Sequence, residues 1–175
     1  MTIGTDRGHV MTLDLRRDFS EVYDHLLERV RAFDPAGGNV LGDPGPVRLL
    51  TVGFEYSQDG WLVLAFDCRA DADWDGEWDH VIEASRLDRP HWQAAGEAGG
   101  PHHLIQPDGS TTVVAAGVEP AEWLGKLLTA VVLKARADGV FAAMPKADGC
   151  ELWVTHFSGA YDWPRYEDRG RDNLI

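Results

Sequence analysis

Residues 47–68 read VRLLTVGFEYSQDGWLVLAFDC, and this stretch decides the fold. Two apolar runs, rich in strand-forming residues, flank Asp59-Gly60, a dipeptide typical of tight β-hairpin turns. The pattern therefore predicts a hairpin of strands 47–56 and 61–68. Its turn could hold two residues, Asp59-Gly60, or three, residues 58–60.

The hydrophobic pattern favours the three-residue turn. A two-residue turn would place Val52 opposite Asp67, and a shift of one residue moves every side chain to the other face. The three-residue turn gathers the large apolar side chains on one face. Gly60 then takes the left-handed conformation, in which a Cβ is costly. The predicted pairs are Tyr56 with Leu62, Phe54 with Leu64, Val52 with Phe66 and Leu50 with Cys68.

Apolar periodicity predicts two long helices. Residues 18–33 carry apolar side chains at helical spacing, with Asp18 as the expected cap. Residues 120–138 carry a wider apolar stripe, with Pro120 in the first turn. Shorter helices are predicted at 78–87 and from Pro90 onward.

Two more hairpins are predicted at 103–106/111–115 and 140–145/150–157, because each pair of strands flanks an Asp-Gly dipeptide. Tight turns join antiparallel strands. The elements together predict an α+β fold, in which an antiparallel sheet built from β-hairpins carries the two long helices on it.

The length of 175 residues is typical of a single domain. We expect a flexible leader at 1–15, one α+β domain at 16–166 and a flexible tail at 167–175. The N-terminal segment lacks a secretory signal, and no stretch approaches the roughly 18 apolar residues that span a bilayer. Cys68 and Cys150 fall in predicted strands, where a free thiol is usually a buried apolar group. A cytoplasmic, reducing location is therefore expected.

The net charge of the chain limits the kinds of partner that it is expected to bind. The chain has 29 acidic and 16 basic residues, a formal net charge of -13. Binding to nucleic acid needs a basic surface, so such a partner is not expected. An acidic surface favours a metal ion, a basic protein or a basic peptide, although acidity can also serve solubility alone.

The acidic segment at residues 71–83 resembles a calcium-binding loop in the spacing of its carboxylates. Carboxylates at alternate positions followed by a glycine are typical of calcium-binding loops. Ile82 departs from this pattern, because it stands where a bidentate glutamate belongs, and Glu83 comes one residue late. The alternative is an acidic surface loop with Trp78 packed on the sheet. The candidate calcium ligands are Asp71, Asp73, Asp75 and Glu77.

Histidines and cysteines suggest a weaker enzymatic alternative. No two of the seven histidines show the helical spacing of a zinc site. His156 falls on the apolar face of its predicted strand, which indicates a hydrogen-bonded core histidine. A small hydrolase with a His/carboxylate site remains an alternative, as does a cysteine–histidine pair. No catalytic residue is assigned.

Aromatic residues mark the expected partner-binding surface. Tyrosine and tryptophan are enriched at protein interfaces. The alternative is that Tyr161 and Trp163 fold back onto the core. The candidate partner-binding residues are Trp74, Glu77, Trp78, Tyr161 and Trp163.

Residues 47–165 resemble small acidic bacterial α+β proteins, among them immunity proteins of polymorphic toxin systems. The resemblance rests on the hairpin that runs into Asp75-Gly-Glu-Trp78, the amphipathic helix before a last hairpin, and Ser158-Gly-x-Tyr-x-Trp-Pro164. It implies that the protein binds and neutralises a partner toxin without catalysis or a cofactor. We therefore expect a non-enzymatic protein-binding module with a basic partner. A calcium-binding domain that uses the acidic loop at 71–83 and a small hydrolase are the alternatives.

Overall fold

The computed structural model describes residues 10–34, 45–68, 84–164 and 173–175. The fold is α+β, as predicted. In chain order the elements are β1 (Met11–Asp14), α1 (Leu15–Ala32), β2 (Val47–Glu55), β3 (Trp61–Asp67), β4 (Ala84–Asp88), α2 (Pro90–Ala98), β5 (His102–Ile105), β6 (Thr111–Val114), α3 (Pro120–Ala137), a 3₁₀ helix (Val140–Ala143), β7 (Lys146–His156) and β8 (Asp162–Trp163).

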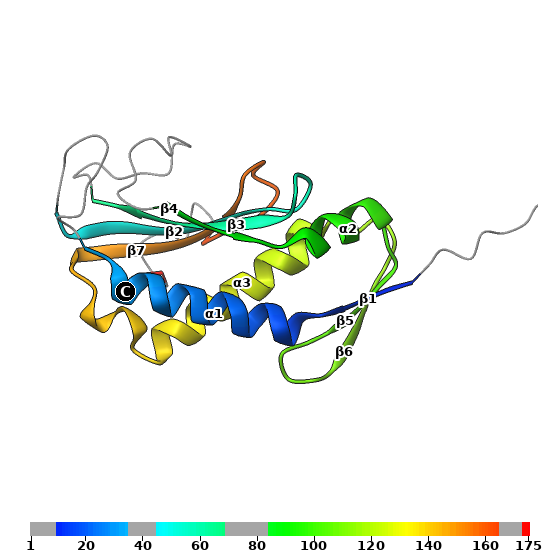
Figure 1. The fold of residues 1–175 in the computed structure, drawn as a ribbon, viewed down its shortest axis with the longest axis horizontal. Coiled ribbons are helices and arrows are strands. Elements are labelled where there is room, and N and C mark those ends of the chain that lie inside the picture. Colours follow the sequence, from blue (N-terminus) through cyan, green and yellow to red (C-terminus); the bar gives the residue numbers. More distant parts are fainter. Residues whose placement is uncertain (1–9, 35–44, 69–83, 165–172) are drawn as a thin grey trace, which may run out of the picture.

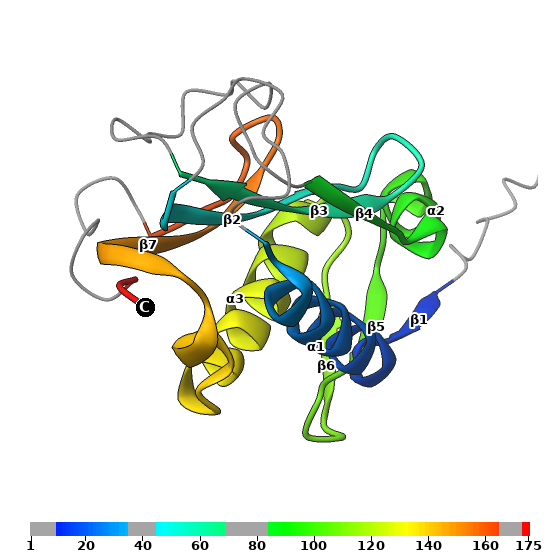
Figure 2. The ribbon, with the colours of Figure 1, turned by 60° about the vertical axis from the view of Figure 1, so that its left-hand side comes forward.

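Two sheets organise these elements. The larger has five strands in the order β4-β3-β2-β7-β8, and α1 and α3 pack side by side against one of its faces (Figure 1). The smaller has the order β1-β5-β6 and lies at the end of the molecule where α1 begins (Figure 2). The helix α2 connects the two sheets, because it follows β4 and precedes β5.

The hairpin of β2 and β3 is confirmed, but its predicted register was wrong by two residues. The loop holds residues 56–60, and both Asp59 (φ 62°) and Gly60 (φ 59°) adopt the left-handed conformation. The Gly60 carbonyl accepts a hydrogen bond of 2.5 Å from the Arg89 amide, which ties the loop to the start of α2. The observed pairs are Leu50 with Phe66, Val52 with Leu64 and Phe54 with Leu62.

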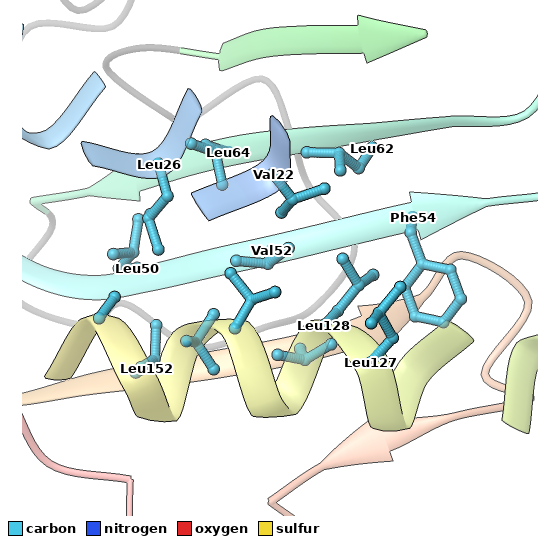
Figure 3. Close-up of a cluster of buried hydrophobic side chains, with 14 of the residues drawn as sticks. Val22, Leu26, Leu50, Val52, Phe54, Leu62, Leu64, Leu127, Leu128 and Leu152 are labelled. Carbon is cyan, nitrogen blue, oxygen red and sulfur yellow. The ribbon is translucent and has the colours of Figure 1, made fainter. Parts of the chain in front are cut away.

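A shift of two residues keeps every side chain on its predicted face. The even-numbered apolar side chains of β2 and β3 therefore form the core as predicted. They pack against α1 and α3, and Leu152 of β7 joins them (Figure 3). The labelled core side chains are Val22, Leu26, Leu50, Val52, Phe54, Leu62, Leu64, Leu127, Leu128 and Leu152.

The predicted hairpin 140–145/150–157 was wrong. Residues 140–143 form a 3₁₀ helix, and residues 146–156 form one strand that pairs in parallel with β2. The Asp-Gly dipeptide ending at Gly149 (φ 75°) lies within β7, beside the point where the β2–β7 register shifts. The larger sheet is therefore mixed rather than antiparallel. The hairpin 103–106/111–115 is confirmed as β5 and β6, but it belongs to the smaller sheet.

Both long helices are confirmed with small shifts at their ends. The helix α1 starts at Leu15, and Asp14 rather than Asp18 caps it by accepting from the Arg16 amide. The strand Met11–Asp14 lies inside the predicted leader and pairs with β5. The predicted helix 78–87 was wrong at its C-terminal end, where β4 lies instead.

The last three residues dock on the sheet. Asn173 is fully buried, and its carbonyl accepts a 2.9 Å hydrogen bond from the Leu152 amide. The Ile175 amide donates to the Cys150 carbonyl at 3.0 Å. Most of the predicted tail lies outside the described residues, but its end belongs to the fold. In the part of the chain that the structure describes, no helix is long and apolar enough to cross a membrane.

Candidate binding groove

A groove opens where the first turns of α3 face the turn between β7 and β8, and its volume is about 980 Å³. The loop before α3 and the start of that helix form one wall. Residues 159–163 form the other. The side chains that determine its chemistry are Glu119, Glu122, Lys126, Tyr161, Asp162 and Trp163.

The groove is acidic. Glu119, Glu122 and Asp162 are exposed carboxylates, and Lys126 is the one cation among the residues that line the groove. Lys126 Nζ lies 2.6 Å from Glu122 Oε1 in an exposed pair on α3, which contributes little stability. Because one ammonium group balances only one carboxylate, the groove keeps a net negative charge.

Tyr161 is fixed to α3 through a glycine. A Cβ at Gly125 would lie 2.3 Å from the Tyr161 ring, so the ring rests directly on the helix backbone. The Tyr161 hydroxyl lies 2.9 Å from Thr129 Oγ1. Burial raises the pKa of Tyr161 despite that hydrogen bond. Glycine inside a helix costs about 1 kcal/mol relative to alanine, and the close approach of the ring accounts for a glycine here.

A buried histidine lies beneath the same turn. His156 is 4% exposed, and its Nδ1 accepts a 3.2 Å hydrogen bond from the Ser158 amide. Because an amide can only donate, Nδ1 is the acceptor of this hydrogen bond. Ser158 Oγ lies 2.8 Å from Nδ1. The prediction of a hydrogen-bonded core histidine is confirmed.

Glu55 completes this cluster from β2. Its Oε1 lies 3.4 Å from His156 Nε2, within ion-pair range but without hydrogen-bond alignment. Oε1 also accepts from the Tyr56 amide (2.8 Å), the Ser57 amide (2.7 Å) and the Ser57 hydroxyl (2.8 Å). Burial raises the pKa of Glu55, but the hydrogen bonds from Ser57 and Tyr56 and the nearby His156 outweigh it. The net pKa lies below the ordinary value of 4.5.

Tyr56 connects the buried cluster to the groove. Its ring centroid lies 5.2 Å from that of His156, and its hydroxyl donates to Glu119 Oε2 at 3.2 Å. Burial and the nearby carboxylate raise the pKa of Tyr56. Tyr56, which packs on the buried His156, thus holds the groove carboxylate of Glu119 in place.

A second His/carboxylate pair lies in a hollow of about 520 Å³ between the start of α1 and the start of α2. The carboxylate of Asp18 is 3% exposed, and its oxygens lie 2.9 and 3.0 Å from His91 Nε2. Arg89 Nε lies 3.4 Å from Asp18 Oδ1, and Arg89 Nη2 lies 3.0 Å from Glu21 Oε2. These two arginine contacts are electrostatic, because neither has hydrogen-bond alignment.

The two cysteines do not form a reactive pair with histidine. Burial raises the pKa of Cys68 to about 11 and that of Cys150 to about 12. The thiolate is the nucleophile, so both thiols are inert near neutral pH.

Two of the predicted partner-binding residues lie in the groove. Tyr161 and Trp163 pack on the core, as the alternative interpretation expected, and they also line the groove. Their binding of a partner stays a prediction. Trp74, Glu77 and Trp78 lie outside the described residues. The same holds for the predicted calcium ligands Asp71, Asp73, Asp75 and Glu77. In the four described ranges, no cluster of three or more His, Cys, Asp or Glu side chains could hold a metal ion.

Sequence reasoning missed the groove carboxylates. Glu122 has an ordinary explanation as an acid in the first turn of α3, and Glu119 precedes that helix. Asp162 is distant from both in the chain, and only the tertiary fold brings it to the opposite wall. Comparisons with protein-family models, with curated proteins and with solved structures found no match for this chain.

Proposed function

We propose that this protein is a non-enzymatic binding module whose groove between α3 and the β7–β8 turn receives a basic protein. One observation carries the proposal. Three exposed carboxylates and two aromatic rings line the same groove, with a single lysine among them. An immunity-type role, in which the bound partner is a basic toxin, is the form of this proposal that the sequence resemblance favours.

The groove is complementary to a basic partner in charge and in the aromatic surface that it offers. A lysine or arginine side chain can place its charge among the carboxylates while its stem or guanidinium plane lies on an aromatic ring. The Tyr161 ring is anchored in advance by its contacts with Gly125 and Thr129, so this side chain loses little conformational entropy on binding. The overall charge of -13 should also accelerate association with a basic partner at low salt.

Charge-neutralising variants test the proposal. The triple variant E119Q/E122Q/D162N keeps the shape of the groove and removes its charge. The matched control, D24N/E28Q/E97Q, removes three exposed carboxylates elsewhere. With a synthetic arginine-rich peptide as the probe, the groove variant should bind at least about tenfold more weakly than the control at 50 mM salt. Equal loss of affinity in both variants would show that only the overall charge matters.

One observation favours a second candidate function, a serine hydrolase. Ser158 Oγ, His156 Nδ1 and Glu55 lie in the order of a nucleophile, a base and an orienting acid. The test is covalent labelling by a fluorophosphonate probe, followed by mass spectrometry of the modified residue. Labelling of Ser158 that disappears in S158A would support a hydrolase. Absence of labelling in the folded protein would remove this candidate.

A further inference from the structure

The strand β6 is an outer strand of the smaller sheet. Within the described residues it pairs only with β5, in the register His102 with Val114, His103 with Val113, Leu104 with Thr112 and Ile105 with Thr111. The Gln106 amide donates to the Ser110 carbonyl at 2.8 Å. Hydrogen-bonded pairs alternate along antiparallel strands, so the backbone groups of Thr112 and Val114 face β5. Those of Thr111 and Val113 therefore face outward.

The four residues of β6 carry neither of two features that commonly discourage edge pairing, a charge or a proline. The sequence Thr-Thr-Val-Val has high strand propensity. Val113 is 64% exposed, the largest exposed fraction among the large apolar side chains that the structure describes. Such an edge is a template for a further strand.

An apolar pocket lies beside the same strand. Its volume is about 270 Å³, and Thr112 and Val114 of β6 line it together with Leu104, Trp123 and Leu127. Because side chains alternate along a strand, Thr112 and Val114 share the face toward the pocket. The indole Nε1 of Trp123 is buried and has no hydrogen-bond acceptor in the described part of the chain. A pocket of about 270 Å³ has room for one apolar side chain of an added strand.

The pocket adjoins the acidic groove. Val118, Glu122 and Lys126 line both. Alternate side chains of an extended strand lie roughly 7 Å apart on one face. A strand that fills the pocket with one side chain would carry the next ones on that face toward the groove carboxylates. The two features thus form one continuous surface.

We propose that β6 receives an extended segment of the basic partner, which pairs with the outer edge, fills the pocket with an apolar side chain and directs arginine or lysine side chains toward the groove. The proposal rests on the proposed function, because the groove supplies the charge that selects the partner. A second copy of this chain is a poorer occupant, because two chains of charge -13 repel each other.

The decisive variant is Val113→Pro. Proline removes the outward-facing N–H, and proline is tolerated on an edge strand whose N–H faces solvent. Val113→Thr is the matched control, because it keeps the N–H and the strand propensity. Thr111→Pro removes the other outward donor at the start of the strand, so it replaces V113P if thermal melting shows that V113P does not fold.

The probe is the peptide acetyl-Arg-Thr-Leu-Thr-Arg-Thr-Arg-amide, which places leucine and arginines on one face of a strand and threonines on the other. We expect V113P to weaken binding about tenfold or more and V113T to change it less than about threefold, as measured by calorimetry. In antiparallel pairing the threonine N–H groups of the peptide face β6. The same peptide N-methylated at its threonines loses these donors, and it should bind as weakly to the wild-type protein as the parent peptide binds to V113P.

The outcomes separate this inference from the proposed function. If V113P binds as tightly as V113T while E119Q/E122Q/D162N loses affinity, the groove binds the peptide and the edge does not, so this inference is wrong. If the wild-type protein does not bind the peptide, both proposals fail. If sedimentation shows a wild-type dimer that V113P converts to a monomer, the edge pairs with a second copy instead, and the inference is again overturned.

Discussion

Two buried carboxylates in this molecule each lie beside an imidazole, but they are stabilised in different ways. Glu55, under the groove, accepts hydrogen bonds from two amides and a hydroxyl of its own turn, and His156 beside it is 4% exposed. Asp18, in the hollow between α1 and α2, faces the buried guanidinium of Arg89, and the side chain of His91 is 43% exposed. One carboxylate depends on local backbone donors. The other depends on a charge from a distant element.

The contacts of the two carboxylates therefore stabilise different parts of the fold. The hydrogen bonds to Glu55 come from neighbours in the chain, so they shape the end of β2 and the loop that follows. Arg89 and His91 come from the start of α2, so their contacts with Asp18 join α1 to α2. Removing a charge should therefore have a large effect in the hollow and a smaller one under the groove.

The largest effect is expected for Arg89→Met. Asp18 would keep its buried position without the guanidinium, and breaking a buried pair by removing one partner costs about 3–5 kcal/mol. The free energy of unfolding from urea denaturation measures it. Arg86→Met is the control, because Arg86 pairs with Asp88 on the surface and should change the stability by less than about 1 kcal/mol. A loss in R89M no larger than that in R86M would show that Asp18 does not depend on Arg89.

A smaller effect, confined to the groove, is expected for Gly125→Ala. The new Cβ would meet the Tyr161 ring at 2.3 Å. Overpacking costs about 1–3 kcal/mol, and the better helix propensity of alanine offsets about 1 kcal/mol of it. Thermal unfolding measures the net loss. In the Tyr161→Ala background the same change should be neutral or stabilising, and an equal loss in both backgrounds would contradict the proposed contact.

An effect no larger than that of Gly125→Ala is expected for Glu55→Gln, which keeps an acceptor oxygen at the same place. Loss of charge in hydrogen bonds from two amides should cost about 1–2 kcal/mol at pH 7. Because the pKa of Glu55 in the folded protein lies below 4.5, the stabilisation by its charge is present above pH 4.5 and is lost as the pH falls toward the folded-state pKa. The stability gap between wild type and E55Q should therefore shrink below about pH 4.5.

Urea denaturation at a series of pH values measures that gap. Glu122→Gln is the matched control, because Glu122 forms only an exposed pair with Lys126, which contributes little. A gap for E55Q that stays constant down to pH 3 would show that the carboxylate charge does not stabilise the fold.

The sequence predicted which side chains face the core better than it predicted which strands pair with each other. Asp-Gly dipeptides were interpreted as hairpin turns at Gly60, Gly109 and Gly149, and the first two interpretations are confirmed. The third failed because a local turn signal does not reveal whether the flanking residues pair with each other or with a distant strand. Residues 146–156 pair with β2, and the dipeptide lies beside a register shift.

The candidate site was predictable only in its local parts. The aromatic content of residues 157–166 pointed to Tyr161 and Trp163, which line the groove. Asp18 was interpreted as a helix cap, because an aspartate before an amphipathic run is typical of one. Its role beside Arg89 and His91 depends on the tertiary fold, which brings the start of α2 to Asp18 and which no local pattern encodes.

The parallel pairing of β2 with β7 has a consequence for the order of folding. Leu50 pairs with Phe66 close by in the chain, but its other neighbour in the sheet is Leu152. The chain can form the first contact early, whereas the second requires closure of a long loop that includes α2 and α3. During synthesis the centre of the larger sheet is therefore an open edge until residues 146–156 have emerged, and in that interval the chain is most exposed to misassociation.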